Sequence, residues 1–99
     1  MAAVHEPGGA FDLDRPWRVH PQVALRPEAF GALAYHFGTR RLSFLKSPEV
    51  RALVQSLADH PTARAACAAA ALEGPTLASY AQALGTLATT EMIIEREAA

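Results

Sequence analysis

Large hydrophobic residues alternate with small or polar ones along residues 33–37, and residues 40–45 continue the pattern, which has the period of a β-strand. Gly38 and Thr39 separate the two segments, and glycine at the first central position suits a two-residue type II′ turn. The register set by this turn pairs Phe37 with Arg40, Tyr35 with Leu42, and Leu33 with Phe44. The pattern therefore predicts a hairpin.

The large hydrophobic side chains of this hairpin share one face, and a shift of one residue would scatter them. We expect this face to lie against the core. The opposite face receives Ala34 with Ser43 and His36 with Arg41, and we expect it to face solvent. Residues 23–26 form a candidate strand that precedes the hairpin and is closed by Pro27, so residues 40–45 are the third strand in chain order.

After the hairpin the hydrophobic period becomes helical. Ser47 suits the N-cap position and Pro48 the first helical residue. One hydrophobic face then follows at helical spacing, made of Val50, Leu53, Val54 and Leu57.

Two further helices are predicted. One runs from about residue 62 to residue 72, with Gly74-Pro75 as its stop. The other is capped by Thr76, and residues 93 and 94 are expected to pack back after it as a short tail. The third helix carries one hydrophobic face, made of Leu77, Tyr80, Leu84 and Leu87.

Three strands followed by three helices imply an α+β fold, with a three-stranded antiparallel sheet preceding the helices. The 99 residues suit one domain. Proline, glycine and aspartate are frequent in residues 1–16, so we expect a flexible or loosely docked N-terminal arm there. Phe11, Leu13 and Trp17 are the residues that would pin its end to a domain spanning residues 17–95.

Composition narrows the possible environments. The net charge of −1 provides no broad basic field, which argues against a nucleic-acid partner. Cys67 is the single cysteine, so no internal disulfide can form and a reducing, cytoplasmic location is expected. The first ten residues lack a secretory signal, and no hydrophobic stretch approaches the ~20 residues that span a bilayer, so no membrane contact is expected.

Catalytic and metal-binding candidates are few. Cys67 lies among alanines, a setting typical of a buried, inert thiol. No glycine-rich phosphate loop is present, and the carboxylates form no pair suited to acid–base chemistry. We therefore expect no catalytic residue, no metal, no cofactor and no enzymatic activity. The possible metal ligands lack zinc-site spacing: His5, His20, His36, His60 and Cys67.

The same order of elements also fits a winged helix that reads DNA, so a DNA-binding regulator is the alternative function. A recognition helix needs arginine or lysine to contact phosphates and base edges. Residues 77–90 contain neither, and the second predicted helix offers only Arg64. This lack of basic residues argues against the alternative.

Basic charge gathers on and after the hairpin. Four basic residues and Glu49 leave an excess of +3 within residues 40–51. Edge strands often carry such protective charges, so one interpretation is an ordinary solvated edge. The other is an acidic partner docked beside the third strand. The basic residues are Arg40, Arg41, Lys46 and Arg51.

Two segments have a distinctive sequence: residues 17–28, WRVHPQVALRPE, and residues 30–47, FGALAYHFGTRRLSFLKS. They resemble the peptide chaperones of mycofactocin biosynthesis, the small B proteins of that pathway. The similarity extends more loosely to about Ile94. That family is similar to the small D protein of pyrroloquinoline quinone biosynthesis, and both are recognition elements for ribosomally synthesised, modified peptides.

The resemblance implies a winged-helix-like fold and a redox-cofactor pathway. It implies binding of the precursor's leader segment as an added strand against the third strand, in a groove walled by the third helix. It also implies delivery to a radical S-adenosylmethionine maturase, which modifies the precursor's C-terminal Val-Tyr end.

By position, the resemblance places the peptide-binding residues on the third strand and the residue after it, and on the third helix. Tyr80 and Leu84 fit core positions equally well. The set is Arg40, Arg41, Leu42, Ser43, Phe44, Leu45, Lys46, Leu77, Tyr80, Ala81 and Leu84.

Overall fold

The centre of the fold is an antiparallel sheet of three strands in the order β2-β3-β4, in a computed structural model that describes residues 11–97. The strands are β2 (Val23–Glu28), β3 (Gly31–His36) and β4 (Leu42–Leu45). Leu33 lies opposite Phe44 and Tyr35 opposite Leu42, so the predicted hairpin register is confirmed. The α+β class is confirmed as well.

The turn between β3 and β4 differs from the predicted type II′ turn. Arg40, not Gly38, has a positive φ of 67°, and its amide donates to the carbonyl of His36 at 2.7 Å. The His36 ring explains the difference, because its Nδ1 accepts hydrogen bonds from the amides of Gly38 and Thr39 at 3.0 and 3.1 Å. These bonds hold residues 37–40 as a four-residue loop with the same register.

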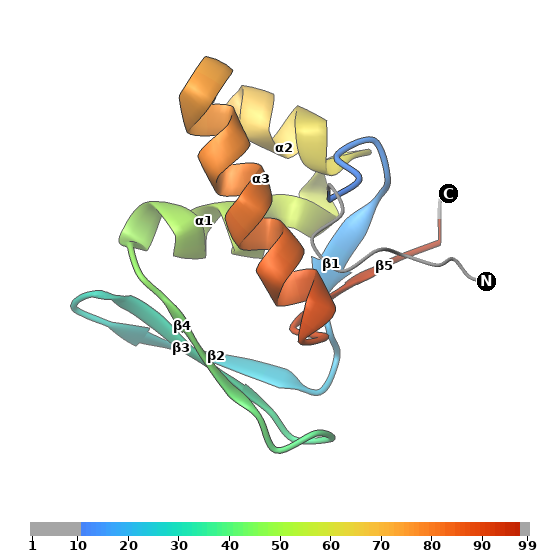
Figure 1. The fold of residues 1–99 in the computed structure, drawn as a ribbon. Coiled ribbons are helices and arrows are strands. Elements are labelled where there is room, and N and C mark those ends of the chain that lie inside the picture. The colour runs from blue at the N-terminus through green and yellow to red at the C-terminus, as the bar shows by residue number, and fades with distance from the viewer. Residues whose placement is uncertain (1–10, 98–99) are drawn as a thin grey trace.

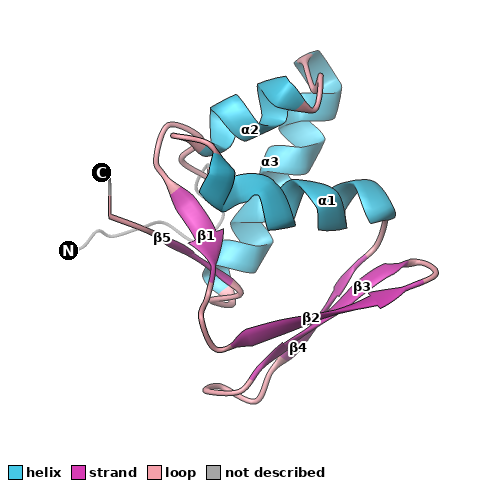
Figure 2. Cartoon of the chain, turned by 180° about the vertical axis from the view of Figure 1, so that it is seen from behind, coloured by secondary structure: helices cyan, strands magenta, loops and turns pink. Residues whose placement is uncertain are grey.

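Three helices lie together on one face of this sheet (Figures 1 and 2). They are α1 (Pro48–Ser56), which continues into a 3₁₀ turn η1 (Leu57–Asp59), then α2 (Ala63–Ala69) and α3 (Gly74–Thr89). The predicted cap of α1 is confirmed, because the Ser47 hydroxyl accepts a hydrogen bond from the Val50 amide at 3.0 Å.

The boundary between α2 and α3 differs from the prediction. Gly74 and Pro75, predicted to stop the second helix, are the first residues of α3. Proline suits the first turn of a helix, where its missing N–H has no partner to lose. The preceding helix instead ends at Ala69, where Ala71 has a φ of 61° and the Leu72 amide donates to the Cys67 carbonyl at 3.0 Å.

A second, two-stranded sheet joins the two ends of the described chain. Strand β1 (Trp17–Val19) pairs in antiparallel fashion with β5 (Ile93–Glu95), and Val19 lies opposite Ile93. The predicted tail at residues 93 and 94 is therefore a strand. Three residues are too few to show a period, so the pairing is visible only when both ends of the chain are brought together.

The core lies between the helices and the central sheet. Small side chains of β3 let the helices approach its backbone closely, and larger ones from the helices and β5 fill the remaining space. The fully buried large side chains are Leu45, Leu57, Leu84, Met92, Ile93, His36 and Cys67.

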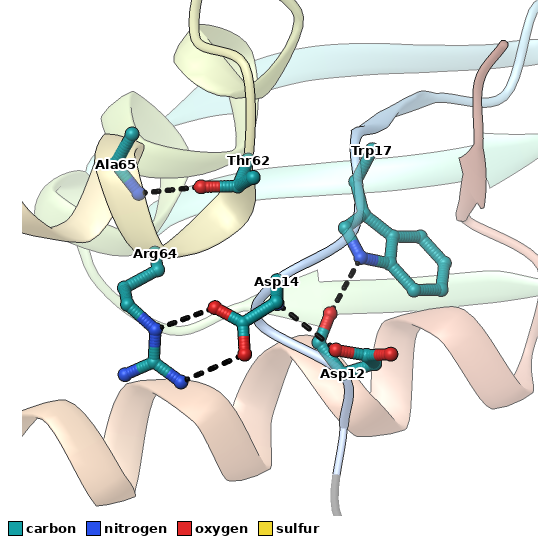
Figure 3. Close-up of polar contacts among 6 residues, drawn as sticks. All are labelled: Asp12, Asp14, Trp17, Thr62, Arg64 and Ala65. Atoms are coloured by element: carbon teal, nitrogen blue, oxygen red, sulfur yellow. Dashed lines mark hydrogen bonds and ion pairs between the residues drawn. The ribbon is translucent and has the colours of Figure 1, made fainter. Parts of the chain in front are cut away.

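Residues 11–16 pack on the helices, and residues 1–10 lie outside the described part of the chain. The ring of Phe11 lies 4.6 Å from that of Trp17, whose Nε1 donates to the Asp12 carbonyl at 2.9 Å (Figure 3). Arg64 donates to Asp14 at 2.7 Å, and this hydrogen bond lowers the pKa of the Asp14 carboxyl (Figure 3). The domain boundary at residue 17 stays a prediction.

Candidate functional site

Strand β4 forms one edge of the central sheet and has unpaired backbone groups. The amide of His36 donates to the carbonyl of Arg41 at 2.9 Å, which makes this pair a hydrogen-bonded one. Hydrogen-bonded pairs alternate along an antiparallel ladder, so Ser43 also bonds to β3. The N–H and C=O groups of Leu42 and Phe44 therefore point away from β3, towards the open edge.

The opposite edge, on β2, is closed to a partner strand. The same alternation places positions 23, 25 and 27 on that edge. Val23 already donates its amide to the His20 carbonyl at 2.9 Å, and Pro27 has no N–H. The strand runs through Pro27 instead of ending there as predicted, because an outward position needs no donor. Only Leu25 keeps a free outward amide, so β4 is the edge that accepts a strand.

A groove of about 370 Å³ runs along the open edge of β4. Its floor is formed by β4 and by Val50 of α1, and its wall is formed by α3. The wall residues Ala83, Thr86 and Leu87 repeat at helical spacing, which is why one face of α3 follows the strand. The edge and the groove together form the candidate site.

The structure places the predicted wall residues elsewhere. Leu84 is fully buried in the core, and Leu77 packs against that core. Tyr80 lines a different cleft, between α1 and α2. Ala81 is half-buried and is not among the residues that line the groove. The groove-lining residues Ala83 and Thr86 each lie one position before a core residue, Leu84 and Leu87, so the two faces of α3 are adjacent. Sequence periodicity alone does not indicate which of these faces packs against the core.

The predicted strand residues do border the site. Ser43, Phe44, Leu45 and Lys46 line the groove, and Leu42 precedes them on the open edge. Three exposed basic residues surround them. Arg40 and Arg41 lie in and beside the loop before β4, and Lys46 directly follows β4. Arg51 does not join this cluster, because its Nη1 donates to the Gly31 carbonyl at 3.0 Å.

The two faces of the central sheet are reversed relative to the prediction. The helices pack on Ala32, Ala34 and His36, which are all buried. The face away from the helices, here called the outer face, carries Leu33, Tyr35, Leu42 and Phe44 of the hairpin, whereas Leu45 is buried opposite Ala32. Small residues at the helix-facing positions allow α1 to pack closely on the sheet, and sequence alternation alone does not indicate which face receives the helices.

Chemical candidates outside the groove are sparse. Cys67 is buried, as predicted, and burial raises the pKa of its thiol. His36, expected to face solvent, is only 2% exposed. Among residues 11–97 no three histidine, cysteine or acidic side chains gather as metal ligands. No helix in the described part of the chain is long and apolar enough to cross a membrane.

Comparisons with known proteins agree with one another. A family model described as "Peptide chaperone MftB family" matches residues 16–94. A relative named peptide chaperone MftB, from Mycobacterium ulcerans, is 58% identical over 90 residues, which cover 91% of this chain and 83% of the relative. A protein of the same name from Mycobacterium tuberculosis is 54% identical over 87 residues, which cover 88% and 80%. No solved structure matches.

Proposed function

The chain belongs to the peptide chaperone MftB family, and from this premise we propose that it binds the leader segment of the mycofactocin precursor peptide as an added strand beside β4. The bound peptide is then presented to a radical S-adenosylmethionine maturase. The chaperone role is non-catalytic, so the chemistry belongs to that partner. The observation that carries the proposal is the open edge of β4 beside an apolar groove.

Strand addition divides recognition between backbone and side chains. The outward N–H and C=O groups of Leu42 and Phe44 supply hydrogen bonds that any peptide sequence can make. Selectivity comes from the groove, where every second side chain of the peptide meets Leu45, Leu87 and their neighbours. A peptide whose side chains fit the groove is therefore held in an extended conformation, and its C-terminal end stays accessible to an enzyme.

A titration of fluorescently labelled precursor peptide tests this function. We expect saturable one-to-one binding by the full precursor and by its isolated leader segment, and no binding by the C-terminal segment alone. We also expect the maturase to modify the precursor faster when this chain is present. Equal affinity for the leader and for a scrambled leader of the same composition would contradict the proposal.

Charge reversal at Arg40 and Arg41 should slow the association of the peptide. Both side chains are exposed near the open end of β4, and opposite charges steer encounter more than they strengthen the bound state. We expect the double variant Arg40→Glu/Arg41→Glu to associate at least about fivefold more slowly, because steering raises association rates by one or more orders of magnitude. Dissociation should change little.

Stopped-flow kinetics at several salt concentrations provide the measurement. The unmodified protein should associate more slowly as the screening length falls from ~10 Å at 0.1 M salt to ~3 Å at 1 M. The matched control is Arg15→Glu/Arg64→Glu, which has the same net charge but changes exposed arginines in the segment before β1 and in α2, away from β4. Association that is independent of salt, or equally slow in both variants, would show that these arginines are only a solvated edge.

A further inference from the structure

The exposed large hydrophobic side chains of the described chain are concentrated on one surface. Phe30, Phe37, Leu42 and Phe44 are 45–59% exposed, and all four belong to the central sheet or its turns. Such side chains scattered singly are ordinary, but a contiguous set indicates a contact surface. This set lies on the outer face, away from the helices, and of its four members only Phe44, on the edge strand, also borders the groove between β4 and α3.

A strand added beside β4 reaches both surfaces. Residues directly opposite one another in neighbouring strands point to the same face of a sheet. Peptide residues opposite Leu42 and Phe44 therefore point to the outer face, whereas the residue opposite Ser43 points into the groove. Successive peptide side chains meet different parts of the chain.

Two hydrophobic contacts are available on the outer face beside the open edge. Phe44 lies edge-on to Phe30, with ring centroids 6.0 Å apart. Leu42 lies directly opposite the half-buried Tyr35. Each of these pairs leaves an exposed apolar surface next to the position of an added strand, and aromatic and β-branched cross-strand neighbours stabilise such pairings.

We propose that Leu42 and Phe44 form a second set of side-chain subsites for the same bound peptide, and that the recognised segment is therefore hydrophobic at successive positions instead of alternate ones. This inference rests on the proposed strand addition at β4. The groove takes one set of side chains and the outer face takes the interleaved set. Acidic residues at the end of that segment meet Arg40 and Arg41.

Charge favours a peptide over a second copy of this chain as the occupant. Two identical outer faces packed symmetrically would bring their own arginines together, since a two-fold interface joins the same patch to itself. The only carboxylate within the three strands is Glu28, and it already pairs with Arg26 at 2.8 Å. Exposed Arg40 and Arg41 beside the outer face therefore repel another copy and attract an acidic peptide.

The test compares serine variants on the outer face. Leu42→Ser and Phe44→Ser should each weaken leader binding about tenfold, as is typical when a well-covered interface side chain is truncated. Both side chains are more than half exposed, so the variants should stay folded by circular dichroism. Phe37→Ser is the matched control and should weaken binding much less, because Phe37 is 58% exposed on the same face but lies in the loop before β4, outside the strand that the peptide pairs with.

A serine scan of the leader provides the second measurement. Two adjacent peptide positions should both lose affinity, and one of them should lose little more when Phe44→Ser is already present. Normal binding by Leu42→Ser and Phe44→Ser, with binding lost in Leu42→Pro, would overturn this inference and leave strand addition intact. Normal binding by Leu42→Pro and Phe44→Pro would instead overturn strand addition itself. A dimer that Phe44→Ser converts into monomers of unchanged peptide affinity would assign the outer face to self-association and also overturn the inference.

Discussion

Replacing Leu42 with proline should weaken binding of the leader peptide about 30-fold more than replacing it with alanine, while leaving the protein folded. The Leu42 N–H points to the open edge, so the substitution removes a hydrogen bond to the peptide and none to β3. A peptide carbonyl left without its donor costs about 2 kcal/mol, which corresponds to about 30-fold in affinity. Pro27 already occupies an outward position of β2, so this sheet accommodates an edge proline.

Two control variants separate the backbone from the side chain. Leu42→Ala keeps the N–H and truncates the side chain, so the additional loss in Leu42→Pro measures the hydrogen bond. Ser43→Pro removes a donor that bonds to β3, and should lower the melting temperature as well as the affinity. Titration of each variant with labelled leader, beside a thermal melt, gives both quantities. If Leu42→Pro bound the leader as tightly as Leu42→Ala, the peptide would not pair with this edge.

Replacing Gly31 with alanine should destabilise the fold by about 4 kcal/mol, a loss found for few single substitutions. Gly31 has a φ of +150°, which residues with a side chain rarely adopt. An added Cβ would lie 2.0 Å from the Leu45 carbonyl oxygen and 2.7 Å from the Ser47 amide nitrogen. These backbone atoms belong to the chain that leaves β4 and enters α1, so they cannot rotate away as a flexible side chain would.

Thermal unfolding followed by circular dichroism measures this effect. For a chain of this size the melting temperature should fall by roughly 20 °C in Gly31→Ala. The matched control is Gly74→Ala, because Gly74 has a φ of +58° but a Cβ added there would meet no neighbouring atom within 4 Å. There the cost is backbone conformation alone, about 1 kcal/mol. Similar melting temperatures for the two variants would show that the close approach to Leu45 is not what constrains position 31.

Local patterns, formed by residues close together in the sequence, determined much of the fold. The hairpin register follows from alternation around the loop at residues 37–40, and the start of α1 follows from Ser47 and Pro48. Periodicity and helix caps act over three to seven residues, so the sequence itself contains the information that these features need. The burial of Cys67 was predictable from composition, because a free cysteine in an apolar segment is usually buried, although the contacts that bury it come from the rest of the core.

The tertiary structure decided which surfaces meet. The sequence predicted that large hydrophobic residues of the hairpin share a face, but only the packing of helices on Ala32 and Ala34 left that face exposed. Thr86 and Leu87 form the wall of the groove, where the sequence had predicted Tyr80 and Leu84. The reason is that the orientation of α3 about its own axis depends on contacts with distant elements. The β1–β5 pairing and the open edge of β4 likewise depend on segments far apart in sequence, and such contacts leave no local pattern in the chain.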